Sequence, residues 1–191
     1  MAAKTESNFK NMVLALFLVT GIAALALGGV YVLTKEPIAI AKQKKLEAAI
    51  KAVLPEFDTI TISKAFDPDG DSLTFYRAEK EGKPIGVAVE TYTNKGFGGT
   101  IDVMVGFSED GTITNTSVLS LKETPGLGDK LQKSKSNFSD QFIGKNPANF
   151  KLLVKKDGGD VDAITAATIS SRAFCDALQR AFDTYEKNKE K

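Results

Sequence analysis

The sequence contains no histidine, no tryptophan and a single cysteine, Cys175, among its 191 residues. Without a second cysteine, no disulfide can form within the chain. Zinc sites and iron–sulfur clusters need several cysteine or histidine ligands, so this chain alone supplies neither. A hydrolase built on a serine–histidine or cysteine–histidine pair is excluded for the same reason. Any redox chemistry must therefore come from a bound organic cofactor, and we predict no metal site.

The chain also lacks a surplus of either charge. It carries 25 lysines and arginines against 24 aspartates and glutamates, which gives a net charge of +1. There is thus no electrostatic basis for binding nucleic acid, and we predict no such partner. Apolar residues make up 42% of the chain and charged residues 26%, as in ordinary globular proteins. The 158 residues that follow one uncharged run near the start are enough for one domain with a core.

The uncharged run is Met12–Leu33. As a helix it would be about 33 Å long, which matches the roughly 30 Å hydrocarbon core of a bilayer. Tyr31 stands near its end, where interfacial aromatic residues are common. We therefore predict a retained transmembrane helix. A cleaved signal peptide is the alternative, with Ala24–Ala26 as a cleavage site, although the apolar run continues beyond those residues.

The residues leave the orientation of this helix open. Two lysines precede it and four follow it closely: Lys4 and Lys10, then Lys35, Lys42, Lys44 and Lys45. The positive-inside rule would keep the following domain in the cytoplasm. Long domains, however, are translocated largely regardless of charge.

The rest of the sequence has the patterns of an α+β domain. A helix is predicted over Ile38–Leu54 and ends before Pro55. It could continue the membrane helix after a break at Pro37. Runs of β-favouring residues between turn signals predict an antiparallel meander. Its strands are expected at Thr59–Lys64, Leu73–Glu79, Pro84–Thr93, Thr100–Ser108 and Thr112–Leu121.

The C-terminal part adds helices that flank this sheet. Asp129–Phe142 is predicted to be partly helical, with Phe138 and Phe142 anchored in the core, and a further strand is expected at Asn149–Lys155. An amphipathic helix should run from about Thr168 to Lys187, with Cys175 as a small buried side chain. The fold class is thus a single transmembrane helix followed by an antiparallel-sheet domain with flanking helices.

One acidic turn has a superficial likeness to a calcium-binding loop. It reads Pro68-Asp-Gly-Asp71. The full acidic spacing and the terminal glutamate of such loops are missing. We therefore interpret the segment as a turn rather than a metal site.

The segment before the last helix, Asp162–Ser171, is rich in hydroxyl groups. Its hydroxyl side chains belong to Thr165, Thr168, Ser170 and Ser171. They can cap the helix. Together with the free N–H groups of a helix N-terminus, they can also bind an anion. The spacing alone favours the cap.

A second motif reads Glu123-Thr-Pro-Gly-Leu-Gly128. It holds an acid, a hydroxyl, a turn-setting proline and two glycines. Glycine allows the backbone to approach a ligand closely, but Pro-Gly is also a common type II turn. Taken alone, the motif indicates a turn.

Together, the two motifs resemble those of a known family. Asp162-Ala-Ile-Thr-Ala-Ala-Thr168 is similar to the D-G-x-[ST]-G-A-T signature of proteins that carry FMN on the final threonine through a phosphoester bond. Alanine replaces glycine at Ala163 and Ala166, positions that tolerate small residues. Glu123–Gly128 resembles the E-T-P-G-L-G loop of the same FMN-binding domain. Nearly the whole chain is similar to the family of G subunits of the Rnf electron-transport complex.

The resemblance implies a cofactor and its site. Thr168 would carry covalent FMN, attached by a flavin transferase that recognises Asp162 and its neighbours. Thr165, Ser170 and Ser171 could donate hydrogen bonds to phosphate or ribityl oxygens. Thr124, Gly126, Leu127 and Gly128 would approach the flavin, while Glu123 would orient the loop or contact the ribityl chain.

The resemblance also implies an assembly and a location. The protein would be an electron-transfer subunit of an ion-translocating ferredoxin:NAD oxidoreductase in a bacterial inner membrane, and it would not turn over alone. Its partners would be the other membrane subunits of that complex. The chain would divide into a cytoplasmic tail (1–11), a transmembrane helix (12–33), a stalk (34–57) and a periplasmic FMN-binding domain (58–191). The alternatives are a subunit of an Nqr-type quinone reductase and a non-catalytic anchored binding module.

Overall fold

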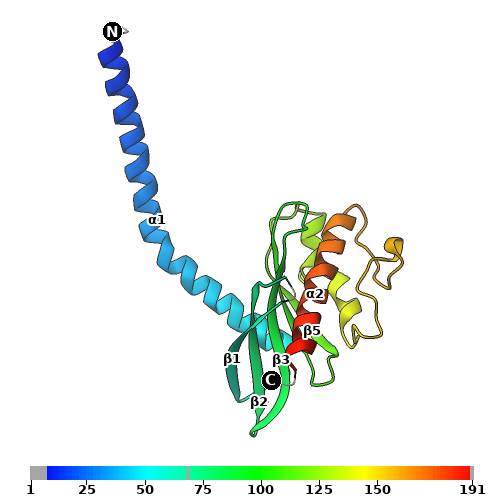
Figure 1. Cartoon of the computed structure of the whole chain (residues 1–191). Helices are drawn as coiled ribbons and strands as arrows, with labels where there is room; N and C mark the ends of the chain where they lie inside the picture. The colour runs from blue at the N-terminus through cyan, green and yellow to red at the C-terminus, as the bar shows by residue number, and fades with distance from the viewer. Residues whose placement is uncertain (1–7, 68, 190–191) are drawn as a thin grey trace. The chain divides into compact units, whose positions relative to one another are not determined.

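The computed structural model describes residues 8–67 and 69–189, so the first seven residues of the expected tail, and Pro68 of the acidic turn, lie outside it. The chain forms two compact units, one ending at Lys44 and the other starting at Lys45. Figure 1 shows the order of the elements along the chain.

The N-terminal unit is helical. Helix α1 spans Phe9–Val53 and includes Pro37, so the expected break at this proline is absent. Proline removes one backbone hydrogen bond, but the neighbouring turns keep theirs. Part of α1 is long and apolar enough to cross a membrane, with a mean hydropathy of 2.5 and none of that window buried. The helix predicted at Met12–Leu33 is thus present, although a signal sequence would have the same length and composition.

The second unit is built on a sheet. Within the described residues, five antiparallel strands follow one another in the order of the chain. They are β1 (Thr59–Phe66), β2 (Ser72–Lys80), β3 (Lys83–Thr93), β4 (Ile101–Phe107) and β5 (Ile113–Ser120). All five predicted strands are confirmed to within two residues at each end, because period-two patterns and Gly-containing turns mark them in the sequence.

Both faces of the sheet are covered, and this explains why its central strands are almost wholly buried. Side chains such as Phe75 and Val89 face a core shared with helix α2 (Thr168–Asn188). Their neighbours Tyr76 and Ala88 face the other side, where the last turns of α1 pack. Figure 1 shows α2 lying along the sheet. The α+β fold class predicted from the sequence is confirmed.

The segment Asp129–Phe142 is partly helical, as predicted. Two short 3-10 helices, η1 (Gly128–Leu131) and η2 (Phe138–Phe142), occupy its ends. The rings of Phe138 and Phe142 lie 5.6 and 5.4 Å from that of Phe174 on α2. This aromatic cluster anchors the segment to the core, as expected.

The predicted strand at Asn149–Lys155 is wrong. Its alternation is real, because Leu152 and Val154 are buried and Leu153 is exposed. However, the segment forms only one isolated bridge, from Val154 to Val161, and the 3-10 helix η3 (Lys155–Asp157) follows. Its backbone hydrogen bonds go to nearby residues, so it contributes buried side chains without joining the sheet.

Cys175 is buried in α2, at 2% exposure. Burial raises the pKa of its thiol to about 12. A thiol in this state is a poor nucleophile and a poor ligand. The interpretation of Cys175 as a small buried side chain is confirmed.

Candidate functional site

Helix α2 begins at Thr168, as the sequence predicts, but its start lacks the predicted side-chain cap. Its N-cap is Ala167, and no side chain caps it. Thr168 is the first helical residue, so Ser170 and Ser171 lie within the first turns and cannot cap. The cap interpretation of the hydroxyl groups is therefore wrong. The N–H groups of the first turn have no partner within the helix and are available to an anion.

The turn before the helix has an unusual backbone. Ala166 has a φ of 62°, in the left-handed region that glycine adopts with the least strain. Ser171 stabilises this turn from inside the helix. Its hydroxyl donates to the carbonyl of Ala167 (3.0 Å) and accepts the N–H of Ile164 (3.0 Å). Ser171 therefore fixes the approach of the chain to the helix.

The Glu123–Gly128 loop lies against the start of α2. Glu123 is only 5% exposed, and its two carboxylate oxygens have different donors. Oε1 accepts the backbone N–H of Gly98 (2.9 Å), while Oε2 accepts the hydroxyl of Ser170. A Cβ atom at Gly128 would lie 2.6 Å from Ser170 Oγ, so only glycine allows this close approach. One buried carboxylate thus joins three segments that are distant in the sequence.

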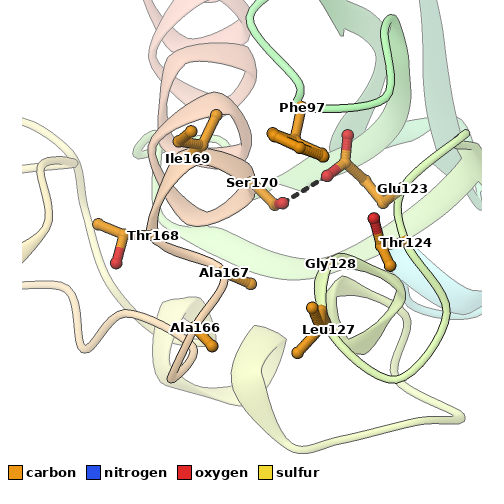
Figure 2. A pocket seen from close by; sticks show the side chains of 10 residues that line it. All are labelled: Phe97, Glu123, Thr124, Leu127, Gly128, Ala166, Ala167, Thr168, Ile169 and Ser170. Carbon is orange, nitrogen blue, oxygen red and sulfur yellow. Dashed lines mark hydrogen bonds between the residues drawn. The ribbon is translucent and has the colours of Figure 1, made fainter.

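A cavity of about 330 Å³ opens between these segments (Figure 2). It is lined by Phe97, Glu123, Thr124, Leu127, Gly128, Ala166, Ala167, Thr168, Ile169 and Ser170. Most of the lining is apolar, with a few polar groups from Glu123, Thr124 and Ser170. This volume and composition are typical of small-molecule sites.

The two motifs therefore meet in space. Of the residues predicted from the sequence, the cavity collects Glu123, Thr124, Leu127, Gly128, Thr168 and Ser170. The others do not line it: Asp162, Thr165, Gly126 and Ser171. Gly126 has a φ of 77° and shapes the turn that presents Leu127. Thr165 is exposed on the connecting loop.

Asp162 lies away from the cavity. Its carboxylate accepts a hydrogen bond from Lys155 Nζ (2.8 Å), and both groups are largely exposed. Its backbone exchanges hydrogen bonds with the side-chain amide of Gln141. Its side chain is thus accessible from solvent rather than directed at a bound cofactor.

The sequence patterns did not identify four of the lining residues, Phe97, Ala166, Ala167 and Ile169. Phe97 belongs to the glycine-rich connection between β3 and β4. The sequence does hold a signal for Phe97, because a single aromatic residue among glycines has few neighbouring side chains to pack against. Ala166 and Ala167 form the turn before α2, and Ile169 lies in its first turn, so all three adjoin the predicted helix start at Thr168.

Similarity to known proteins shows the family to which this chain belongs. A family model described as an FMN-binding domain matches residues 96–183. The chain is 34% identical over 198 residues to the G subunit of the ion-translocating oxidoreductase complex of Aliivibrio fischeri (strain ATCC 700601 / ES114), and the alignment covers 97% of this chain and 93% of that relative. The chain belongs to the family of G subunits of ion-translocating oxidoreductase complexes.

Other G subunits of this name are similar over comparable lengths. That of Vibrio atlanticus (strain LGP32) is 35% identical over 191 residues, which cover 93% of this chain and 90% of the relative. That of Shewanella oneidensis is 34% identical over 185 residues, with 90% and 85% covered. The predicted resemblance to the G subunits of Rnf-type complexes is confirmed, and every cavity-lining residue falls inside the matched FMN-binding domain.

The residues of the cavity fit the group that this domain implies. An FMN needs an anion site for its phosphate and an apolar slot for its ring. The first turn of α2 offers the former through its uncapped N–H groups. Phe97, Leu127 and Ile169 form an apolar edge next to it, and the close packing at Gly128 leaves the loop backbone facing the cavity.

Proposed function

We propose that the chain is a membrane-anchored electron-transfer subunit that carries FMN covalently on Thr168, through the phosphate. The observation that supports this most directly is the meeting of two distant motifs at one cavity, where the uncapped start of α2 faces the Glu123 loop. When bound, FMN supplies reversible electron transfer, for which the chain's own side chains have no substitute.

Different residues of the site are proposed to hold different parts of FMN. The first-turn N–H groups of α2 would bind the phosphodiester, whose remaining negative charge is favoured at a helix N-terminus. Ser170 and Glu123 fix the helix to the loop, and Thr124, Leu127 and Gly128, which line the cavity, would hold the ribityl chain and the ring. Gly126 and Ser171 shape the two turns.

Attachment requires that an enzyme reach Thr168. Asp162 and Thr165 are exposed, and Ala166 adjoins them on the same surface loop. The side chain of Thr168 projects away from Glu123 (Figure 2). A flavin transferase that uses FAD as donor can therefore bind Asp162–Ala166 as a recognition segment. The hydroxyl oxygen of Thr168 would form the new bond to the FMN phosphorus while the pyrophosphate bond of FAD breaks, with AMP as the leaving group.

The proposed organisation follows the family resemblance. Residues 1–11 form a cytoplasmic tail, 12–33 span the inner membrane, 34–57 form a stalk, and 58–191 form the FMN-binding domain on the periplasmic side. The relatives are named as subunits of an ion-translocating oxidoreductase complex. We propose that this chain joins such a complex with the other membrane subunits, relays electrons between ferredoxin and NAD, and has no turnover alone.

Replacing Thr168 with valine tests the covalent link. Val keeps the shape of the side chain but has no hydroxyl to esterify. The full chain is co-expressed with a flavin transferase and run on a denaturing gel under ultraviolet light. We expect a fluorescent band for the parent chain and none for Thr168→Val.

The matched control is Thr61→Val, at an exposed threonine on β1 that lies outside both the recognition segment and the cavity. It should keep the fluorescent band, because its hydroxyl is not the proposed acceptor. A band that persists in Thr168→Val would contradict the assignment, as would loss of the band in Thr61→Val alone.

A further inference from the structure

Two phenylalanines in the described part of the second unit are strongly exposed, Phe66 and Phe97, and of the two only Phe97 lines the cavity. Phe97 is 69% exposed, although a phenyl ring of this size is normally buried. It stands in the β3–β4 connection at the edge of the cavity, opposite the start of α2 (Figure 2). A large apolar side chain left open beside a cavity indicates a contact that the chain itself does not supply.

The backbone around Phe97 is nevertheless tightly held. Gly98 donates its N–H to Glu123 Oε1 (2.9 Å), and a Cβ atom at Gly98 would lie 1.9 Å from the carbonyl oxygen of Lys122. A Cβ atom at Gly96 would lie 2.7 Å from Glu123 Oε1. Gly96 and Gly98 thus pack against the Glu123 segment so closely that a side chain at either position would collide with it. The ring of Phe97 is exposed because the packed backbone holds it at the cavity.

Two other exposed apolar side chains complete an edge around the cavity. Ile169 on α2 is 48% exposed and Leu127 is 39% exposed. Together with Phe97 they come from three segments, and the polar pair of Glu123 and Ser170 lies between them. One aromatic face with two aliphatic neighbours is suited to a flat aromatic ring system, and stacking on the phenyl ring adds to simple burial.

We infer that Phe97 stacks on the isoalloxazine ring of the flavin held at Thr168. Glu123 acts as a positioning residue, since its bond to Gly98 fixes the loop that carries Phe97 and its bond to Ser170 fixes the helix that carries Thr168. This inference rests on the proposed function, because it requires a flavin in the cavity.

The absence of tryptophan from the natural chain provides a direct test. An indole in contact with a flavin donates an electron to the excited ring and quenches its fluorescence, and this transfer falls steeply with distance. The full chain with Phe97→Trp is loaded with flavin, purified in detergent and measured for fluorescence per flavin. We expect a severalfold loss of fluorescence relative to the parent. Phe97→Tyr, with a weaker donor of nearly native size, should show a smaller loss.

Phe66→Trp is the matched control. Phe66 is similarly exposed, at 66%, but lies at the end of β1 and does not line the cavity. Its tryptophan variant should fluoresce like the parent. Unchanged fluorescence in both Phe97 variants would overturn the inference while leaving the covalent flavin intact. Equal quenching at positions 66 and 97 would also overturn it. A parent chain without flavin on Thr168 would instead refute the proposed function.

Discussion

At the scale of single residues, Ala166 is a departure from the family signature that strains the backbone. The signature has glycine at positions 163 and 166, and this chain has alanine at both. Only Ala166 takes a positive φ. A Cβ atom in that region meets the neighbouring backbone, whereas glycine has none. The two alanines, which look equivalent in the sequence, should therefore respond differently to the same change.

We expect Ala166→Gly to raise the free energy of unfolding by about 1 kcal/mol, because it relieves the left-handed strain. Ala163→Gly is the control. It should lower the free energy slightly, since glycine there only adds freedom to the unfolded chain. Urea denaturation of the two variants and the parent, followed by circular dichroism, measures both effects. Destabilisation by Ala166→Gly would contradict this account of the turn.

The sequence predicted the residues of the site unevenly. Thr168 and the Glu123 loop carry recognisable local patterns, so they were predicted. For Ser170, the spacing favours a helix cap and the resemblance implies a contact with the cofactor, but neither indicates its partner Glu123, which lies 47 residues away in the chain. Phe97 follows no periodic pattern, and only the folded chain brings it next to the Glu123 loop and the start of α2. Contacts between distant segments of this kind are not encoded in local spacing.

At the scale of elements, the turn between β1 and β2 is fixed to α2 by charge. Arg180 on α2 pairs with Asp67, which is 2% exposed, and with Asp69 (3.1 Å). Its guanidinium also lies 5.0 Å from the ring centroid of Tyr92. The acidic turn that superficially resembles a calcium loop thus binds an arginine side chain. In the described residues, no three metal-ligating side chains cluster.

This ion pair makes stability depend on pH. Burial alone would raise the pKa of Asp67, but hydrogen bonds from the Asp71 N–H and from Arg180 lower it below its ordinary 3.8. The unfolded state therefore binds more protons between the two pKa values, and stability rises with pH there. The contribution is fully present above about pH 5 and is lost as the pH falls below 3.8 towards the lower folded value.

Asp67→Asn should flatten this acid limb and lower the free energy of unfolding near neutral pH by about 3 kcal/mol, because it leaves Arg180 partly buried without its main partner. Urea denaturation at several pH values between 3 and 6 tests it. Arg180→Gln should flatten the same limb. An acid limb equally steep in the parent and in Asp67→Asn would show that another group is responsible.

The elements themselves were largely predictable, with one instructive exception. The five strands and α2 follow from periodicity and turn residues, whereas α1 follows from its uncharged run and continues through Pro37, where a break is expected. The segment Asn149–Lys155 has the same alternation, since Leu152 and Val154 enter the core. Its one bridge joins Val154 to Val161, a nearby residue, and not to a strand of the sheet. Alternation predicts which side chains are buried, but it does not reveal whether a partner strand is available.

At the scale of the whole molecule, the proposed sidedness is the feature that the sequence leaves open. The lysines around the apolar run favour a cytoplasmic domain, while the family resemblance implies a periplasmic one. Cys175 is buried and has a raised pKa, so the natural chain has almost no reactive thiol. A cysteine introduced at an exposed position therefore reports the side of the membrane without background.

We expect Glu56→Cys, at a side chain that is 93% exposed, to react with a membrane-impermeant maleimide in intact spheroplasts. Lys10→Cys, before the apolar run, is the control and should react only after permeabilisation. Mass spectrometry of the recovered chain reads both. The reverse pattern would place the domain in the cytoplasm and contradict the proposed topology.

Peptide mapping tests the central claim most directly. Trypsin should release residues 157–172, which contain Thr165, Thr168, Ser170 and Ser171 together. For the parent chain matured with a flavin transferase, we expect this peptide to gain the mass of FMN less one water, with fragment ions that place the addition on Thr168. An addition on any of the other three hydroxyl groups, or a fully matured chain whose peptide carries none, would contradict the account.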